Sequence, residues 1–244
     1  MARYDNAGTI ISDVCIEVGL DVVSDPFASQ DPATVKLCRL LTLCGRELIG
    51  VHQWQRMVAR YSVTTTALDT GIYPLPEDYL YMIDQTGWTP TNRLPLGGPL
   101  SAQDWSFIVG SGFMQQTIYV SFREFDGSFN ILPNDPVPTG IEITYEYIRN
   151  TWAQTAADPD VYLDRVTAAD DIVLFPPILI EKMLKLRYLE TIGFPTDSAT
   201  DQFNAALATW LPKDKSARVL NMCGKRLYPY LDWRNIPETG YGPP

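Results

Sequence analysis

Apolar residues recur with the period of an α-helix in two segments near the amino terminus. The first runs from Ile10 to Gly19, and Thr9 precedes it as the expected N-cap. The second begins at Asp31, which a proline follows in the first helical position, and is expected to end near Val51. In both segments the apolar positions form a stripe, so both are predicted to be amphipathic helices that pack on one face.

After the second helix, the pattern of side chains changes to the two-residue period of a β-strand. Residues 57–66 alternate and are rich in β-branched side chains, which predicts a strand. Gly71–Pro76 contains two prolines, each of which restricts the residue before it to extended geometry. Further strands are predicted at Thr117–Arg123, Ser128–Leu132 and Ile141–Arg149, with turn-forming residues between them. Their order in the chain predicts an antiparallel meander.

Helical periodicity returns in the last third of the chain. Ile178–Ile192 has a broad apolar face and is expected to end at Gly193. Ser198 is the expected cap of a further helix, which Pro212 is expected to kink or end. A short helix is also expected from Ser101, inside the strand region. Lone helices of this length are marginal in water, so those before residue 55 are expected to pack against those after residue 176.

These elements predict an α+β fold in which the amino- and carboxy-terminal helices form a bundle and carry an inserted antiparallel β domain. The expected divisions are residues 1–56 and 161–223 for the two parts of the bundle, 57–160 for the β domain and 224–244 for an extended tail. The tail is rich in aromatic residues and prolines and has no regular period. It is expected to be either disordered or an arm that docks on a partner.

Composition narrows the possible partners. The formal net charge of −10 disfavours wrapping of DNA and binding to an anionic membrane. No apolar run reaches the roughly 20 residues needed to cross a bilayer, and the first ten residues lack the features of a secretion signal, so synthesis in the cytosol is expected. The cysteines contain no CxxC pair and are expected to be buried reduced thiols; they are Cys15, Cys38, Cys44 and Cys223.

Candidate chemistry is sparse. His52 is the single histidine, and no nucleophile elbow, Walker loop or zinc-protease motif accompanies it. Glu142 and Glu146 share one face of a predicted strand but lie about 13 Å apart, too far for a pair of glycosidase carboxyls. The acidic segment around Asp160 lacks the pattern of an EF-hand and is expected to be a solvated loop. We therefore expect no enzyme activity, no cofactor and no metal site.

The six tryptophans keep another possibility open, because aromatic side chains also line carbohydrate sites. A tail-associated glycan-binding module would have a pocket lined by tryptophan and carboxylate. A cell-wall hydrolase is a further alternative, and it would need an acidic pair across the β domain. Most of the tryptophans are expected to serve the core or contacts between subunits.

Several short phrases carry a resemblance to a known family. They are Trp54–Met57 (Trp-Gln-Arg-Met), Gly71–Tyr79 (Gly-Ile-Tyr-Pro-Leu-Pro-Glu-Asp-Tyr), Arg93–Trp105, Ile141–Ile148, Trp152 and Leu184–Tyr188. With the order of helices and strands, they make residues 8 to 220 resemble the head-to-tail adaptors of short-tailed bacteriophages, including the connector and tail tubular types. The resemblance rests on architecture and short phrases, not on a catalytic signature.

The resemblance implies a structural virion protein that is synthesised in the host bacterial cytoplasm and assembled at the portal vertex. Such adaptors form a ring, typically of twelve copies, between the portal protein and distal tail proteins such as a nozzle or fibre. DNA passes through the lumen without specific binding. In related adaptors the carboxy-terminal region reaches the portal, so this contact is expected to use Arg226, Tyr228, Tyr230 and Trp233.

Overall fold

The structure is a computed structural model that describes residues 4–66, 70–111, 120–134, 137 and 139–214. The helices are α1 (Ala7–Val18), α2 (Pro32–Val51), α3 (Ala102–Ser111), α4 (Pro177–Ile192) and α5 (Asp197–Asp214), with a 3-10 helix η1 at Gln55–Met57. The strands are β1 (Val58–Thr64), β2 (Ile72–Pro74), β3 (Tyr79–Met82), β4 (Trp88–Thr89), β5 (Leu94–Pro95), β6 (Ser121–Phe125), β7 (Ser128–Leu132), β8 (Glu142–Arg149), β9 (Ala153–Gln154), β10 (Tyr162–Leu163) and β11 (Ile172–Val173). The prediction of a mixed α+β chain with antiparallel sheets is confirmed.

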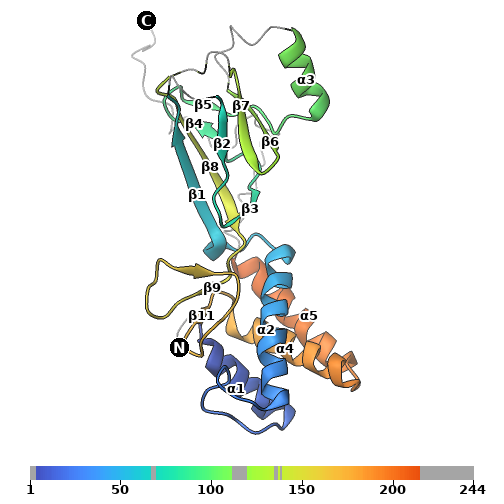
Figure 1. Ribbon diagram of the computed structural model, residues 1–244. Helices are drawn as coiled ribbons and strands as arrows, with labels where there is room; N and C mark the ends of the chain where they lie inside the picture. The colour runs from blue at the N-terminus through green and yellow to red at the C-terminus, as the bar shows by residue number, and fades with distance from the viewer. Residues whose placement is uncertain (1–3, 67–69, 112–119, 135–136, 138, 215–244) are drawn as a thin grey trace, which may run out of the picture.

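The elements gather in two bodies, one above the other in Figure 1. The lower one, here called the helical body, consists of α1, α2, α4, α5 and the small sheet β9–β11. The upper one, the β body, consists of β1–β8 with α3 at its far end. Each body has its own cluster of buried apolar residues.

Local residues explain where most helices begin and end. Asp31 caps α2 as predicted, because its carboxylate accepts a hydrogen bond of 2.9 Å from the Thr34 N–H. Gly193 ends α4 as predicted, at a φ of 82° that favours glycine. The N-cap predicted for the first helix is wrong: Asn6 caps α1 and accepts from the Thr9 N–H, so α1 starts three residues earlier than Ile10. α5 continues through Pro212.

β8 is the central strand of the β body. One of its edges pairs with all of β1, and the other pairs with β3 and then with β4. β7 pairs instead with β2 and β6 in a separate sheet. The predicted meander is therefore wrong. Ile143, Thr144 and Tyr145 are consecutive and all buried, so β8 needs cover on both faces and a central place in its sheet.

The two sheets of the β body pack together through aromatic rings. Phe129 of β7 stacks on Tyr145 of β8, with ring centroids 5.0 Å apart, and also on Phe122 of β6 at 4.9 Å. All three side chains are almost fully buried. This aromatic stack joins strands that are distant in sequence into one core.

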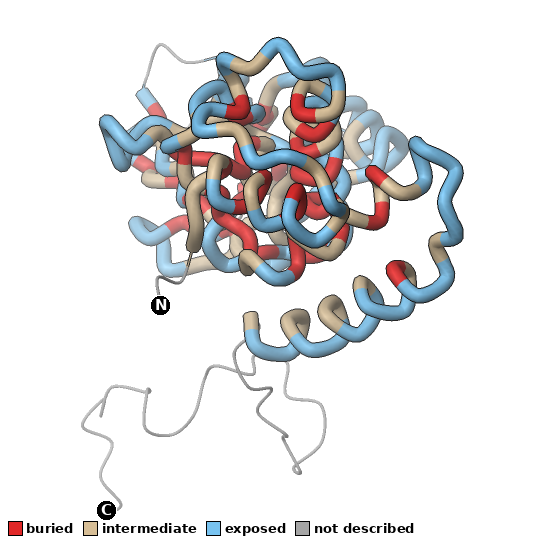
Figure 2. The backbone as a smooth tube through the Cα atoms, turned by 90° about the horizontal axis from the view of Figure 1, so that it is seen from below, coloured by how far each residue is buried: buried red, intermediate tan, exposed pale blue. Residues whose placement is uncertain are grey.

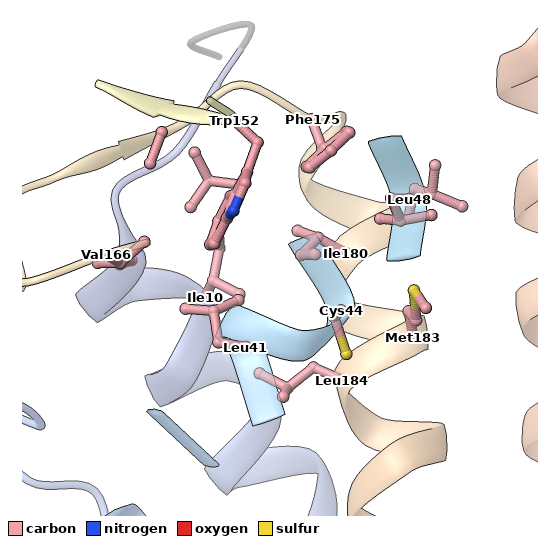
Figure 3. Packing of buried hydrophobic residues seen from close by; sticks show 14 of the residues in the cluster. Ile10, Leu41, Cys44, Leu48, Trp152, Val166, Phe175, Ile180, Met183 and Leu184 are labelled. Atoms are coloured by element: carbon pink, nitrogen blue, oxygen red, sulfur yellow. The ribbon is translucent and has the colours of Figure 1, made fainter. Parts of the chain in front are cut away.

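α4 is the central helix of the helical body and packs against α1, α2 and α5. Trp152, which follows β8, points into the helices above Ile10 and Leu41 (Figure 3). Its indole N–H donates to the carbonyl of Asp164 at 2.7 Å, which fixes the ring. The segment after β8 therefore contributes to the core of the helical body.

α5 is the least buried helix of this body. It contacts α4, yet Ala199 is its one buried residue among those described. Figure 2 shows the helix along the outside of the body, with mostly exposed and intermediate residues. Phe203, Leu207 and Trp210 are only partly buried against the core. α5 thus leaves part of its apolar face accessible.

Candidate interaction surfaces

The residues predicted to contact the portal are Arg226, Tyr228, Tyr230 and Trp233, and all four lie outside the described residues. Their role stays a prediction. The described part of the chain offers three other surfaces, which are the junction of the two bodies, the helix α3 and a pocket in the β body.

At the junction, the end of α5 meets the segment between α2 and β1. The carboxylate of Asp214 accepts a hydrogen bond of 2.9 Å from the backbone N–H of Gln55 and lies 3.4 Å from Nε2 of His52. The ring of His52 also meets that of Trp54 edge-on, with centroids 5.1 Å apart. The single histidine is therefore a buried residue at the point where the helical body leads into the β body.

A small cavity of about 40 Å³ lies beside this contact, between Trp54, Trp210 and Asp214. It combines tryptophan with carboxylate, as the glycan-binding alternative requires. Its volume accommodates about one water molecule, however, whereas ligand sites usually exceed about 300 Å³. This cavity therefore gives no support to sugar binding.

α3 is exposed along its whole length. None of its residues is buried, and the side chains of Phe107 and Val109 are 68% and 50% exposed. The hydroxyl of Ser101 accepts from the Asp104 N–H at 3.1 Å and lies 2.7 Å from the Asp104 carboxylate, which confirms the predicted cap. In Figure 1 the helix projects from the end of the β body. The cap defines where the helix begins, and none of the side chains of α3 is buried.

A larger pocket of about 220 Å³ opens between β3 and β6. Its apolar wall is made by Met82, Leu96, Pro99, Leu100 and Phe122, and its polar rim by Tyr81, Asp84, Gln85, Arg123 and Glu124. No tryptophan lines it. The pocket is suited to an apolar group that carries a polar or charged neighbour.

Two carboxylates of the β body form hydrogen bonds that join strands. Glu124 accepts from the Tyr79 hydroxyl at 2.5 Å, and Glu142 accepts from the Ser62 hydroxyl at 2.9 Å. Burial raises the pKa of Tyr79, and Glu124 raises it further, so this hydroxyl remains a donor at neutral pH. These contacts link neighbouring strands.

The acidic segment that follows β9 is tied down locally. Asp158 accepts from the Asp160 N–H at 3.0 Å, which closes a turn, and Asp164 forms an ion pair with Arg46 of α2 at 3.0 Å. Among the described residues, no three His, Cys, Asp or Glu side chains gather closely enough to hold a metal ion. In the same residues, no helix is long and apolar enough to cross a membrane.

The geometry does not by itself decide whether the chain is an adaptor, a glycan-binding module or a hydrolase. Comparison with known families does. The chain matches the model of the SU10 adaptor protein family over residues 5–222, a range that includes both bodies. The chain belongs to the SU10 adaptor family. The resemblance to phage head-to-tail adaptors is thereby confirmed. A search of the curated proteins gave no match.

Membership in the SU10 adaptor family makes this chain a structural phage protein of the portal and tail region, and the family is not one of enzymes. Exposed apolar side chains on a structural subunit are expected to be contact points for other subunits. Of the described surfaces, α3 and the pocket of the β body are therefore the most relevant.

Proposed function

We propose that this chain is the head-to-tail adaptor that forms a ring beneath the portal, connects the capsid to the tail and continues the DNA channel. The observation that carries the proposal is the family match over residues 5–222. The ring is expected to hold twelve copies, with the portal protein on one side and distal tail proteins, a nozzle or a fibre, on the other.

The two bodies of the structure suit a subunit that contacts different neighbours at its two ends. We assign residues 1–56 and 161–223 to a helical domain, 57–160 to an inserted β domain and 224–244 to a partner-binding tail. The separate core clusters of the two bodies support this division. Trp152 and Ala153 pack with the helices, which favours a boundary a few residues before 160.

The charge of the chain is consistent with a channel that does not hold DNA. A formal net charge of −10 in each copy would repel the phosphate backbone, so DNA could slide through the lumen. A ring built from identical copies also requires two different contact surfaces on each subunit. The exposed apolar residues of the two bodies supply candidates for both.

The contact with the portal is assigned to the carboxy-terminal tail, through Arg226, Tyr228, Tyr230 and Trp233. The aromatic and basic side chains of the tail are of the kinds that dominate protein interfaces.

Cryo-electron microscopy of the tail vertex without imposed symmetry tests the proposal. The expected result is a ring of density directly below the portal into which the helical body and the β body fit, with residues 224–244 on the portal. Density for this chain only at the periphery of the tail would reject the adaptor ring. That outcome would favour the glycan-binding alternative.

A further inference from the structure

α3 and the pocket of the β body are complementary in size and chemistry. A cavity of about 150 Å³ lined by apolar side chains can hold a benzene molecule. The pocket between β3 and β6 has about 220 Å³, and its wall includes Met82, Leu96 and Phe122. It can therefore accept the ring of a phenylalanine. Phe107 of α3 is the most exposed large apolar side chain of the described residues, at 68%.

Phe107 does not fill the pocket of its own chain. The wall of the pocket extends to Leu100, at the base of α3, and Phe107 is not among the residues that line it. In Figure 1 the helix lies at the far end of the β body and projects from it. Each subunit therefore carries an exposed apolar side chain and an unfilled pocket of matching size on separate surfaces.

Charged side chains lie beside both features. Asp104 is the one charged side chain of α3, and it lies one turn before Phe107 and Ile108. Arg123 is the one cation among the residues that line the pocket, where the carboxylates of Asp84 and Glu124 also lie. Glu124, its neighbour on the rim, already accepts the hydroxyl of Tyr79. A helix that enters with Phe107 would bring Asp104 toward the rim, where Arg123 can pair with it.

We infer that Phe107 of one copy inserts into the pocket between β3 and β6 of the neighbouring copy, and that this contact links adjacent subunits of the ring. The inference rests on the proposed function, because it requires several copies side by side. It also explains the stability of α3. A helix of ten residues with no buried side chain is marginal in water, and docking on a neighbour buries its apolar residues.

Disulfide trapping in assembled particles tests this contact. Ser106→Cys places a thiol next to Phe107 without removing it, and Asp84→Cys places one on the rim of the pocket; both positions are exposed. Particles that carry the full-length chain with both changes should give dimers and a ladder of higher multimers after oxidation. Each single change, and the pair Ser106→Cys with Glu77→Cys, should leave the chain monomeric on a non-reducing gel.

Truncation of the Phe107 side chain tests whether its ring makes the contact between copies. Adding Phe107→Ala to the double-cysteine chain should reduce the cross-linked fraction at least about tenfold, because the buried ring is lost. Phe107→Leu should restore most of it. Phe194→Ala is the matched control, since Phe194 is 58% exposed but belongs to the helical body. Phe107 is exposed, so these changes should leave the circular dichroism spectrum of the purified chain unchanged.

Imaging the same particles separates the two proposals. A ring below the portal without the 84–106 cross-link, or with a cross-link that Phe107→Ala does not weaken, would overturn the docking of α3 and leave the adaptor function standing. A disulfide within one chain would overturn it too, because α3 would then fold onto its own pocket. Absence of any ring would reject the proposed function, and the docking with it.

Discussion

The side-chain carboxylate of Asp214 accepts a hydrogen bond from the backbone N–H of Gln55, 159 residues earlier in the chain. The same carboxylate faces His52, and the two side chains are only 11% and 5% exposed. One acidic group at the end of α5 thus fastens the carboxy-terminal helices to the segment that enters the β body.

Removal of this carboxylate should loosen the junction. Asp214→Ala is expected to lower the free energy of unfolding by about 1–3 kcal/mol, because Gln55 and His52 lose a partner in a mostly buried place. Urea unfolding measures the change. Asp201→Ala, on the exposed side of α5, is the control and should change the stability by less than about 0.5 kcal/mol. Equal effects of the two changes would show that the contact contributes nothing.

Gly45 and Gly50 of α2 should respond in opposite directions to alanine. A Cβ on Gly45 would overlap the indole of Trp152, which its bond to Asp164 holds in place. Gly45→Ala is therefore expected to destabilise the protein by about 1–3 kcal/mol. Gly50 has open space at its Cβ position, so Gly50→Ala should stabilise α2 by up to about 1 kcal/mol. Thermal or urea unfolding distinguishes the two, and a stable Gly45→Ala variant would contradict the packing of Trp152.

The ion pairs of Glu17 should make stability depend on acid pH. Burial alone would raise the pKa of Glu17, but its hydrogen bonds to Lys182 and Lys185 lower it below the ordinary 4.5. The folded pKa is depressed, so the stabilisation is present above pH 4.5 and is lost as the pH falls through the folded value. Glu17→Gln should lower stability at pH 7 by at most about 1 kcal/mol, since the pair is partly exposed. Unfolding curves of the two proteins should converge once the pH falls below the folded pKa of Glu17.

Glu181, on the same interface between α1 and α4, should make stability depend on pH in the opposite direction. Burial raises its pKa, and the charges of Asp13 and Glu17 raise it further. Because the folded pKa is raised, the protonated form of Glu181 contributes stability below pH 4.5. That stability is lost as the pH rises through the folded pKa. Glu181→Gln is therefore expected to increase stability at pH 7 relative to the unchanged protein. A decrease there, measured by urea unfolding, would contradict the burial of this carboxylate.

Two thiols of α2 should resist alkylation in the folded protein, those of the buried Cys44 and of Cys38, which is only partly buried, not fully buried as predicted. Burial raises the pKa of Cys38 to about 11 and that of Cys44 to about 12, so few of these groups are thiolates at pH 8. Iodoacetamide followed by peptide mapping should show slow labelling of both cysteines in buffer and rapid labelling in urea. Rapid labelling of Cys44 in buffer would mean that the contact between α2 and α4 opens readily.

The sequence by itself determined where several helices begin or end. Asp31 with the proline after it starts α2, Ser101 starts α3 and Gly193 ends α4, because each acts on backbone groups within about four residues of itself. The prediction for Thr9 was wrong for a local reason as well, since Asn6 offers a better acceptor at the right distance. The short phrases along the chain also indicated the adaptor family correctly.

Only the tertiary structure decided which elements meet. β8 pairs with β1 and not with β7, Trp152 packs among the helices, and Asp214 reaches Gln55. The exposure of Phe107 and the pocket of the β body likewise have no signature in the sequence. Periodicity shows that a segment has an apolar face, but the partner of that face is chosen by competition among all apolar surfaces of the chain. That choice depends on packing between residues far apart in sequence.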